Sequence, residues 1–178
     1  MLLEVLVSII ICSIGLLGLA ALQIVSLRNS THSYMRSQAT LLAQNIADRM
    51  RVNLPGVVGG SYHMTTVPDD PGFNCSTTFP LNQLSCDKDQ MAQVDLYEWT
   101  TSVRNILLNG TGIVCVDSVK DSYFTPDDPQ CDTPTMPPPA GSIYAIKIAW
   151  DENRDGHIDA NDPVLITSLR LPSDEKFK

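Results

Sequence analysis

The stretch DENRDGHIDAND, residues 151–162, places residue types that bind metal ions at a regular spacing. Oxygen donors recur at alternate positions and Gly156 occupies the turn, which is the pattern of the calcium-binding loop of EF-hands. Calcium takes about six to eight hard oxygen ligands, and this spacing could wrap them around one centre. The expected ligands are side-chain oxygens and one main-chain carbonyl, contributed by Asp151, Asn153, Asp155, His157 (carbonyl), Asp159 and Asp162.

This loop departs from the EF-hand pattern in two ways. Its last ligand is Asp162 where the pattern has a longer glutamate, and strand-forming sequence and Pro163 flank it in place of helices. The alternative is an acidic hairpin in which Asp155-Gly156 only turns the chain. Such a turn needs no further acids at fixed offsets, so we favour Ca²⁺ as a cofactor, with weak affinity on the order of 10⁻⁴–10⁻³ M.

A second chemical feature is the carboxylate of Glu4, which lies at the edge of an apolar run. The run Val5–Val25 has the length of about 20 residues that a membrane span needs. No lysine or arginine precedes Arg28, which disfavours a cleaved secretory signal and favours a retained membrane anchor. Glu4 is then either an interfacial residue that reaches water or a functional group with a specific partner.

The cysteines indicate an oxidising compartment. Cys12 lies in the apolar run and is expected to pack as a small apolar residue. The remaining cysteines are even in number and lack CxxC spacing, which disfavours zinc and redox chemistry. Of the possible pairings we favour the sequential one, because each bond closes a loop rich in Pro, Asn or Asp. The expected disulfides are Cys75–Cys86 and Cys115–Cys131, typical of the periplasm or cell exterior.

Composition excludes other classes of function. The net charge is −8 and basic residues are not clustered, so no direct nucleic-acid binding is expected. The only histidines are His32, His63 and His157, and no protease, hydrolase or phosphate-loop motif is present. We therefore expect a protein without enzymatic activity.

The elements that position these residues begin with one long helix from near Met1 to about Asn53. No proline or glycine interrupts it between Gly18 and Pro55. Its second part carries an apolar stripe at helical spacing, formed by Met35, Ala39, Leu42, Ile46 and Met50. The expected organisation is a membrane and assembly half at residues 1–26, an amphipathic half at 27–53 and a globular head at 54–178.

The head is expected to contain one helix and three strands. The helix spans 89–110, ends at Gly110 and has an apolar face of Leu96, Trp99, Val103 and Ile106. A loop at 67–86 precedes this helix, and strands are predicted at 112–119, 142–150 and 163–171, the first two separated by a Pro-rich loop at 121–141. The predicted fold is α+β, with the long N-terminal helix packed on a small antiparallel sheet and disulfide-tied loops.

The N-terminal sequence resembles a known family. LLEVLVS followed by SIGLLGLAALQ resembles the signature of type IV pilins, and SYMRSQATLLAQNIADRMRVN is similar to PilV-type minor pilins. The first motif is shared with pseudopilins of type II secretion. The two motifs lie within the first 53 residues, and the rest resembles the family only in layout. The resemblance implies a type IV pilin-like fold.

The resemblance also implies a role for Glu4. It matches the family's invariant glutamate, which compensates the N-terminal amine of a neighbouring subunit in the fibre, and opposite charges attract strongly in a low-dielectric environment. In the family this glutamate is fifth after a basic leader ending in glycine. Here it is fourth, so we expect a trimmed start, with Met1 at the second mature position and prepilin peptidase acting on a preceding leader.

The expected function is that of a minor pilin that helps initiate assembly of the type IV pilus and caps it. Implied partners are other minor pilins, the major pilin, the inner-membrane assembly machinery and, through residues 1–26, membrane lipid. The expected location is the bacterial inner membrane with the head in the periplasm, then the tip of the extracellular pilus, serving motility, attachment or DNA uptake. Two alternatives are a minor pseudopilin of type II secretion and a membrane-anchored, calcium-dependent adhesion module.

Overall fold

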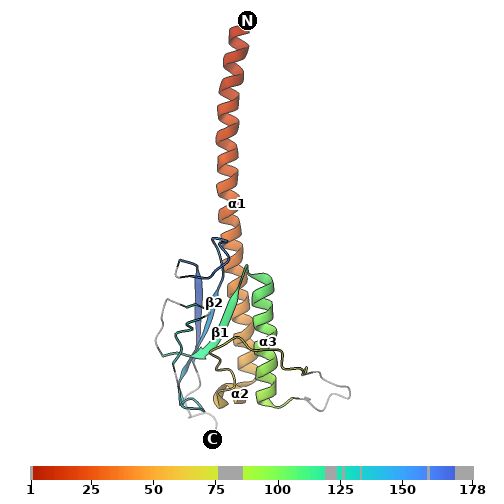
Figure 1. Cartoon of the computed structure of the whole chain (residues 1–178), viewed down its shortest axis with the longest axis vertical. Helices are drawn as coiled ribbons and strands as arrows, with labels where there is room; N and C mark the ends of the chain where they lie inside the picture. The colour runs from red at the N-terminus through yellow and green to blue at the C-terminus, as the bar shows by residue number, and fades with distance from the viewer. Residues whose placement is uncertain are drawn as a thin grey trace. The chain divides into compact units, whose positions relative to one another are not determined.

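The structure, a computed structural model, describes residues 2–75, 86–118, 124–125, 127–132, 134–159 and 161–170. Its elements follow one another along the chain as shown in Figure 1. They are α1 (Leu2–Val52), α2 (Leu54–Gly59), α3 (Lys88–Ile106), β1 (Thr111–Val116), β2 (Ile143–Ala149) and β3 (Val164–Arg170). The chain divides into two compact units, Met1–Ser37 and Gln38–Lys178. We call them the N-terminal unit and the head unit.

The N-terminal unit is the first part of α1, and its apolar side chains are exposed on every side. Within the described residues, α1 is the one helix long and apolar enough to cross a membrane, judged by length and composition. The hydroxyl of Ser8 donates to the Glu4 carbonyl at 2.8 Å, and that of Ser13 donates to the Ile9 carbonyl at 2.7 Å. These bonds satisfy the hydroxyls within the helix, so the unit presents a hydrocarbon surface.

The head unit begins with the second part of α1, whose apolar stripe is buried. The structure confirms the predicted stripe for Ala39, Leu42, Ile46 and Met50, all of which are buried, whereas Met35 is half-exposed. The helix ends at Val52, one residue from the expected end. This amphipathic face stabilises the second part of α1, because helices in proteins gain most of their stability from the packing of such a face.

A short helix, α2, follows at once, where Pro55 and Gly56 predict the end of helical structure. Asn53 caps α2, its side-chain oxygen accepting a hydrogen bond from the Gly56 N–H at 3.3 Å. Proline is tolerated in a first helical turn, where its missing N–H has no intrahelical partner in any case. Gly60 then ends α2 in the left-handed conformation with φ of 91°.

The next helix, α3, starts at a capping box and ends earlier than predicted. The Asp87 side chain accepts from the N–H of Gln90, whose side chain accepts from the N–H of Asp87. The prediction that α3 reaches Gly110 with Ile106 on its apolar face was wrong. Ile106 is 41% exposed, whereas Leu107, already extended, is 1% exposed and takes the core position.

The three strands form one antiparallel sheet in the order β1-β2-β3. β1 ends at Val116, before the predicted end at 119, β2 is one residue shorter at each end, and β3 begins one residue later than predicted; positions 119 and 171 of the predicted strands lie outside the described residues. One face packs toward the helices, since the Tyr144 hydroxyl donates to the Val57 carbonyl at 3.0 Å. The other face carries Lys147, whose ammonium contacts the carbonyls of Pro129 and Gln130 next to Cys131. The predicted α+β, type IV pilin-like fold with two disulfides is confirmed.

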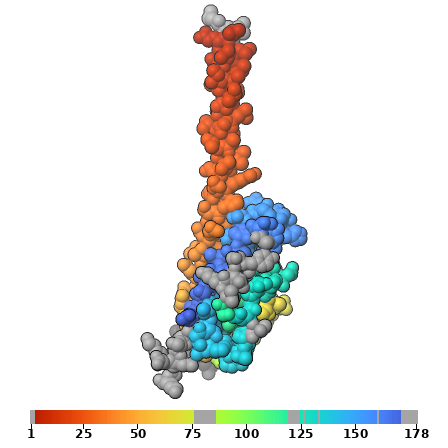
Figure 2. Space-filling view, turned by 90° about the vertical axis from the view of Figure 1, so that its left-hand side faces the viewer, coloured from red at the N-terminus to blue at the C-terminus, as the bar shows by residue number. Residues whose placement is uncertain are grey.

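Figure 2 views the molecule from the side on which β3 lies. The blue of the β2–β3 loop and of β3 is at the surface in this view. Residues of β3 are half-buried or exposed, whereas every residue of β1 is buried. The sheet therefore has one covered edge and one peripheral edge.

Candidate functional site

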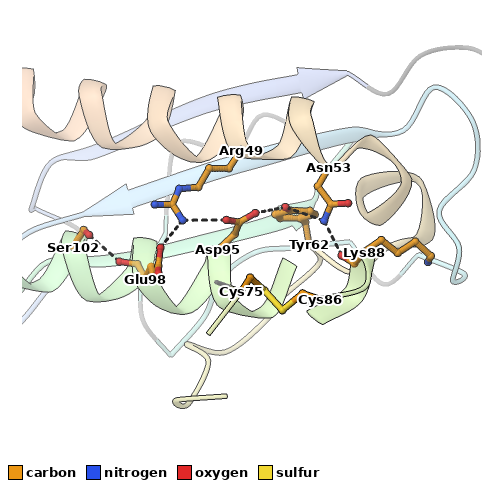
Figure 3. A network of polar contacts seen from close by, with 9 residues as sticks. All are labelled: Arg49, Asn53, Tyr62, Cys75, Cys86, Lys88, Asp95, Glu98 and Ser102. Carbon is orange, nitrogen blue, oxygen red and sulfur yellow. Dashed lines mark hydrogen bonds and ion pairs between the residues drawn. A yellow bond between two sulfur atoms is a disulfide. The ribbon is translucent and has the colours of Figure 1, made fainter. Parts of the chain in front are cut away.

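A polar network fastens the second part of α1 to α3 (Figure 3). The Arg49 guanidinium donates through Nη1 to Asp95 Oδ1 at 3.0 Å and to Glu98 Oε2 at 2.7 Å. Asp95 also accepts a hydrogen bond from the Tyr62 hydroxyl at 2.5 Å. The side chains of Arg49 and Asp95 are only 34% and 13% exposed, so solvent screens this pair less than a surface pair.

Asn53 extends the network to the start of α3. Its side-chain nitrogen donates to the Lys88 carbonyl at 2.7 Å and to the Tyr62 hydroxyl at 3.3 Å. Burial, reinforced by the Asp95 carboxylate, raises the pKa of the Tyr62 phenol, which therefore stays a hydrogen-bond donor. Near this end of α3, the disulfide Cys75–Cys86 links residue 75 to the residue just before the N-cap of α3 (Figure 3). Residues distant in sequence thus fix how α1 and α3 pack.

Trp99 forms the apolar counterpart of this network. Its indole N–H donates to the Leu42 carbonyl of α1 at 2.9 Å, and the residue is 1% exposed. A Cβ at Gly112 of β1 would lie 2.6 Å from the Trp99 ring, so only glycine fits there. One side chain therefore joins α1, α3 and the sheet, and its role is packing, as the sequence suggested.

A buried ion pair holds the disulfide loop against the other face of the sheet. Lys147 Nζ lies 2.6 Å from Asp117 Oδ2, and the two side chains are 0% and 3% exposed. The ammonium also donates to the carbonyls of Pro129 at 2.9 Å and Gln130 at 2.6 Å. The ammonium therefore lies among two carbonyl oxygens and one carboxylate. Sequence reasoning missed this site, although a lone lysine within the apolar strand SIYAIKIAW was a visible signal.

The predicted calcium loop is centred on Asp151, which is 2% exposed. Its carboxylate accepts hydrogen bonds from the N–H groups of Arg154 at 2.6 Å and Gly156 at 2.9 Å, and from the Asn109 side chain at 3.0 Å. Burial acts to raise the pKa of Asp151, but these hydrogen bonds outweigh it and the pKa is lowered. Asp151 is thus held as a carboxylate at the base of the loop.

The other predicted ligands lie around this base. Asp162 is also buried and accepts from the Glu152 and Asp159 N–H groups at 3.1 Å and 3.0 Å. Asn153, Asp155, His157 and Asp159 are exposed, and the three with side-chain oxygens use them on nearby backbone N–H groups. Among the described residues, which leave out position 160 of this loop, no three His, Cys, Asp or Glu side chains converge as a metal-binding group.

The assembly residue and the cysteines lie as follows. Glu4 is exposed in the first turn of α1, where a negative charge is favourable toward the helix dipole. The disulfides are Cys75–Cys86 and Cys115–Cys131, with Cα–Cα distances of 5.4 Å and 6.0 Å. Cys12 is an exposed free cysteine on the apolar surface of the N-terminal unit.

Comparison with known proteins gives one family. Residues 21–97 match the model of the Tt1218-like family, described as type IV pilin Tt1218. This region, under half of the chain, runs from the apolar part of α1 into α3. No curated protein and no solved structure matches. Together with the long N-terminal helix, the small antiparallel sheet and the two disulfides, the match supports a type IV pilin, a structural and generally non-enzymatic class.

Proposed function

We propose that this chain is a minor pilin of the PilV type that helps initiate assembly of the type IV pilus and caps it at the tip. The observation that carries the proposal is the contrast along α1. Its first part has an apolar surface exposed on every side, and its second part is fastened by Arg49 and Trp99 to a disulfide-braced head. Such a helix can exchange membrane lipid for the helices of neighbouring subunits.

Two features of the N-terminal unit support helix packing as the mechanism. A Cβ at Gly15 or Gly18 would meet nothing within 4 Å, so both positions are open to the close approach of another helix. Glu4, near the beginning of the same surface, would pair with the N-terminal amine of a neighbour. Two opposite charges at the low dielectric of a helix bundle attract strongly once both are withdrawn from water.

In this proposal the subunit resides in the bacterial inner membrane before assembly, with its head in the periplasm. The pilus assembly machinery then moves it into the fibre, where the head contacts other minor pilins and the α1 surface contacts the major pilin. A preceding leader would be removed by prepilin peptidase. The head's exposure at the tip would let it serve motility, adhesion or DNA uptake.

The test follows the full chain in a bacterium that assembles it. Sheared surface fibres and inner membranes are analysed by intact mass. The expected result is a form in the fibres with a trimmed, methylated N-terminus one residue before Met1. The Glu4→Gln variant should reach the membrane normally but fall at least about a hundredfold in the fibres, because removing one partner of a buried ion pair costs about 3 kcal/mol or more. Asp48→Asn, the same chemical change elsewhere on α1, is the matched control.

An untrimmed form confined to membranes would overturn this proposal. It would favour the alternative of a membrane-anchored, calcium-dependent adhesion module. Recovery of the chain with a secretion complex, and not with pili, would favour a minor pseudopilin of type II secretion.

We also propose that residues 151–162 bind Ca²⁺ and that the ion stabilises the head. The support is the ligand spacing together with the curl of the loop around the Asp151 carboxylate. Binding would require the exposed Asn153, Asp155 and Asp159 oxygens to exchange their backbone N–H partners for the ion. Asp155→Asn/Asp159→Asn is the variant of choice, because both side chains are exposed and Asp151 keeps its structural bonds.

The expected result is a rise in melting temperature at millimolar Ca²⁺ that is lost in this double variant. Mg²⁺, which demands smaller and more rigid octahedral coordination, is the control ion. A melting temperature that does not change with millimolar Ca²⁺ would contradict the calcium proposal and would not bear on the pilin proposal.

A further inference from the structure

A polar segment of α1, residues 28–37, follows the apolar surface of the N-terminal unit. All of its residues except Met35 are exposed. The hydroxyl of Thr31 donates to the Leu27 carbonyl at 3.0 Å, so this group is satisfied within the helix. The segment directly follows Leu27, the last residue of the apolar surface, which is 69% exposed. It is therefore the first polar surface that this helix presents where it leaves a hydrocarbon layer.

The charge of this polar segment is opposite to that of the chain as a whole. Arg28 and Arg36 are the only basic or acidic side chains other than histidine between Glu4 and Asp48, whereas the whole chain has a net charge of −8. Arg28, His32 and Arg36 follow one another at intervals of four residues, so they lie on one side of the helix. We call these three residues the basic stripe.

Helix geometry directs the basic stripe toward the apolar end of α1. Side chains of an α-helix are tilted toward its N-terminus, and the N-terminal part of α1 is the apolar part. Arg28 lies three residues after Val25, which places its Cα about 4.5 Å beyond a hydrocarbon layer filled by Val5–Val25. Lipid headgroups extend about 5–7 Å from that layer. The Arg28 guanidinium therefore reaches the phosphates, and that of Arg36 lies within about one Debye length of them.

We propose that the basic stripe binds the headgroups of anionic phospholipids in the membrane leaflet on the side of the head. This inference rests on the proposed function, in which residues 1–26 span the membrane. Arg28 contacts a phosphate directly, and Arg36 adds attraction to the negative surface. An arginine carries five N–H donors, so one that already has a protein partner can also contact a phosphate. Tyr34, which is 58% exposed, is an aromatic residue of the kind enriched at membrane–water interfaces.

The position of the basic stripe favours lipid over protein as its partner. The stripe adjoins the apolar surface without a break, so the lipid that surrounds this surface before assembly also reaches Arg28. Basic residues that set the orientation of a membrane helix lie on its cytoplasmic side. Arg28 and Arg36 follow the span on the side of the head, so orientation gives no reason for them, whereas headgroup binding does. An acidic surface of a neighbouring subunit is the competing partner.

The test measures which lipids the full chain retains. The chain is reconstituted in vesicles of equal parts phosphatidylcholine and phosphatidylglycerol and extracted in mild detergent, and its bound lipids are counted by mass spectrometry. The wild type should retain phosphatidylglycerol at least about fivefold over phosphatidylcholine, the preference expected from one arginine near an anionic surface. Arg28→Gln/Arg36→Gln should lose this preference, and Arg28→Lys/Arg36→Lys should keep most of it, because lysine also binds phosphate. Arg51→Gln, an exposed arginine elsewhere on α1, is the matched control.

A second measurement needs no variant. The preference of the wild type for phosphatidylglycerol should weaken as sodium chloride is raised from 0.01 M to about 1 M, because salt screens charges at the membrane surface. Equal retention of the two lipids by the wild type, a preference that salt does not weaken, or one that Arg28→Gln/Arg36→Gln keeps, would each overturn the inference.

Flotation of the same vesicles separates this inference from the proposed function. A chain that floats with the vesicles but shows no lipid preference is anchored without headgroup binding, which contradicts the inference alone. A chain that does not float contradicts the membrane anchoring on which the proposed function depends.

Discussion

The two units of this chain solve the problem of apolar side chains in opposite ways. In the N-terminal unit the large apolar residues remain exposed, and the helix relies on its own backbone hydrogen bonds and on hydroxyls bonded within the helix. In the head unit the same helix buries a narrow stripe and is fixed by side chains of α3. A single helix can thus be stable alone in one solvent and dependent on tertiary contacts in another.

The largest effect on the stability of the head is expected at Trp99. Trp99→Ala should destabilise the head by about 3–5 kcal/mol, because it leaves a cavity where α1, α3 and β1 meet. The free energy of unfolding, from urea denaturation followed by circular dichroism, measures this effect. The control is Leu17→Ala in the N-terminal unit, where the side chain is 71% exposed and the head should be unaffected. Equal effects of the two changes would contradict the division into independent units.

A somewhat smaller effect is expected at the buried ion pair. Lys147→Met removes the partner of the Asp117 carboxylate and the donor to two loop carbonyls, which should cost about 3 kcal/mol. The double variant Lys147→Met/Asp117→Leu should recover part of this loss, because it also removes the buried carboxylate that faces Lys147. Calorimetric melting of the wild type, the single variant and the double variant measures these changes in stability. A double variant less stable than Lys147→Met would show that Asp117 stabilises the head independently of Lys147.

The pH dependence of head stability offers a finer test. Burial lowers the pKa of His63 below 6.5, and Asp132 opposes this only in part. The neutral His63 ring accepts a hydrogen bond from the Val116 N–H. Its contribution to the unfolding free energy is therefore fully present above pH 6.5 and is lost as the pH falls below 6.5 through the lowered pKa of the folded state. The unfolding free energy of the wild type should therefore drop more steeply below pH 6.5 than that of His63→Gln. Parallel curves for the two proteins would contradict the assignment.

The smallest effect on the stability of the head is expected from substitutions in the N-terminal unit. Gly15→Ala and Gly18→Ala should change the unfolding free energy of the head by less than about 0.5 kcal/mol, because neither position touches other residues. The same denaturation experiment measures it. A larger change would mean that the N-terminal unit contributes to the folding of the head.

The spacing of apolar residues along the sequence predicted the helices and strands that depend on nearby residues. The stripe that includes Ile46 and Met50 follows from helical spacing, and the sheet follows from three runs of strand-forming residues. The end of α3 was missed because Leu107, not Ile106, takes the core position, and a tertiary contact decides between neighbouring apolar residues. Boundaries set by such competition cannot be read from periodicity.

The polar contacts of the head were beyond local pattern for a different reason. The Arg49–Asp95 and Lys147–Asp117 pairs join residues far apart in sequence, and many oppositely charged residues were equally available as partners. Only the fold brings the particular pair together and removes it from water. By contrast, the acidic residues of 151–162 were visible as a set, because their spacing is local.

The placement of the indole rings gives the chain an optical property. Its two tryptophans, Trp99 and Trp150, are each 1% exposed and both belong to the head unit. Tryptophan emission therefore reports on the core of the head alone, and the N-terminal unit is dark at those wavelengths. The purified protein in micelles and in vesicles can then be compared by the same spectrum, whatever surrounds the apolar helix.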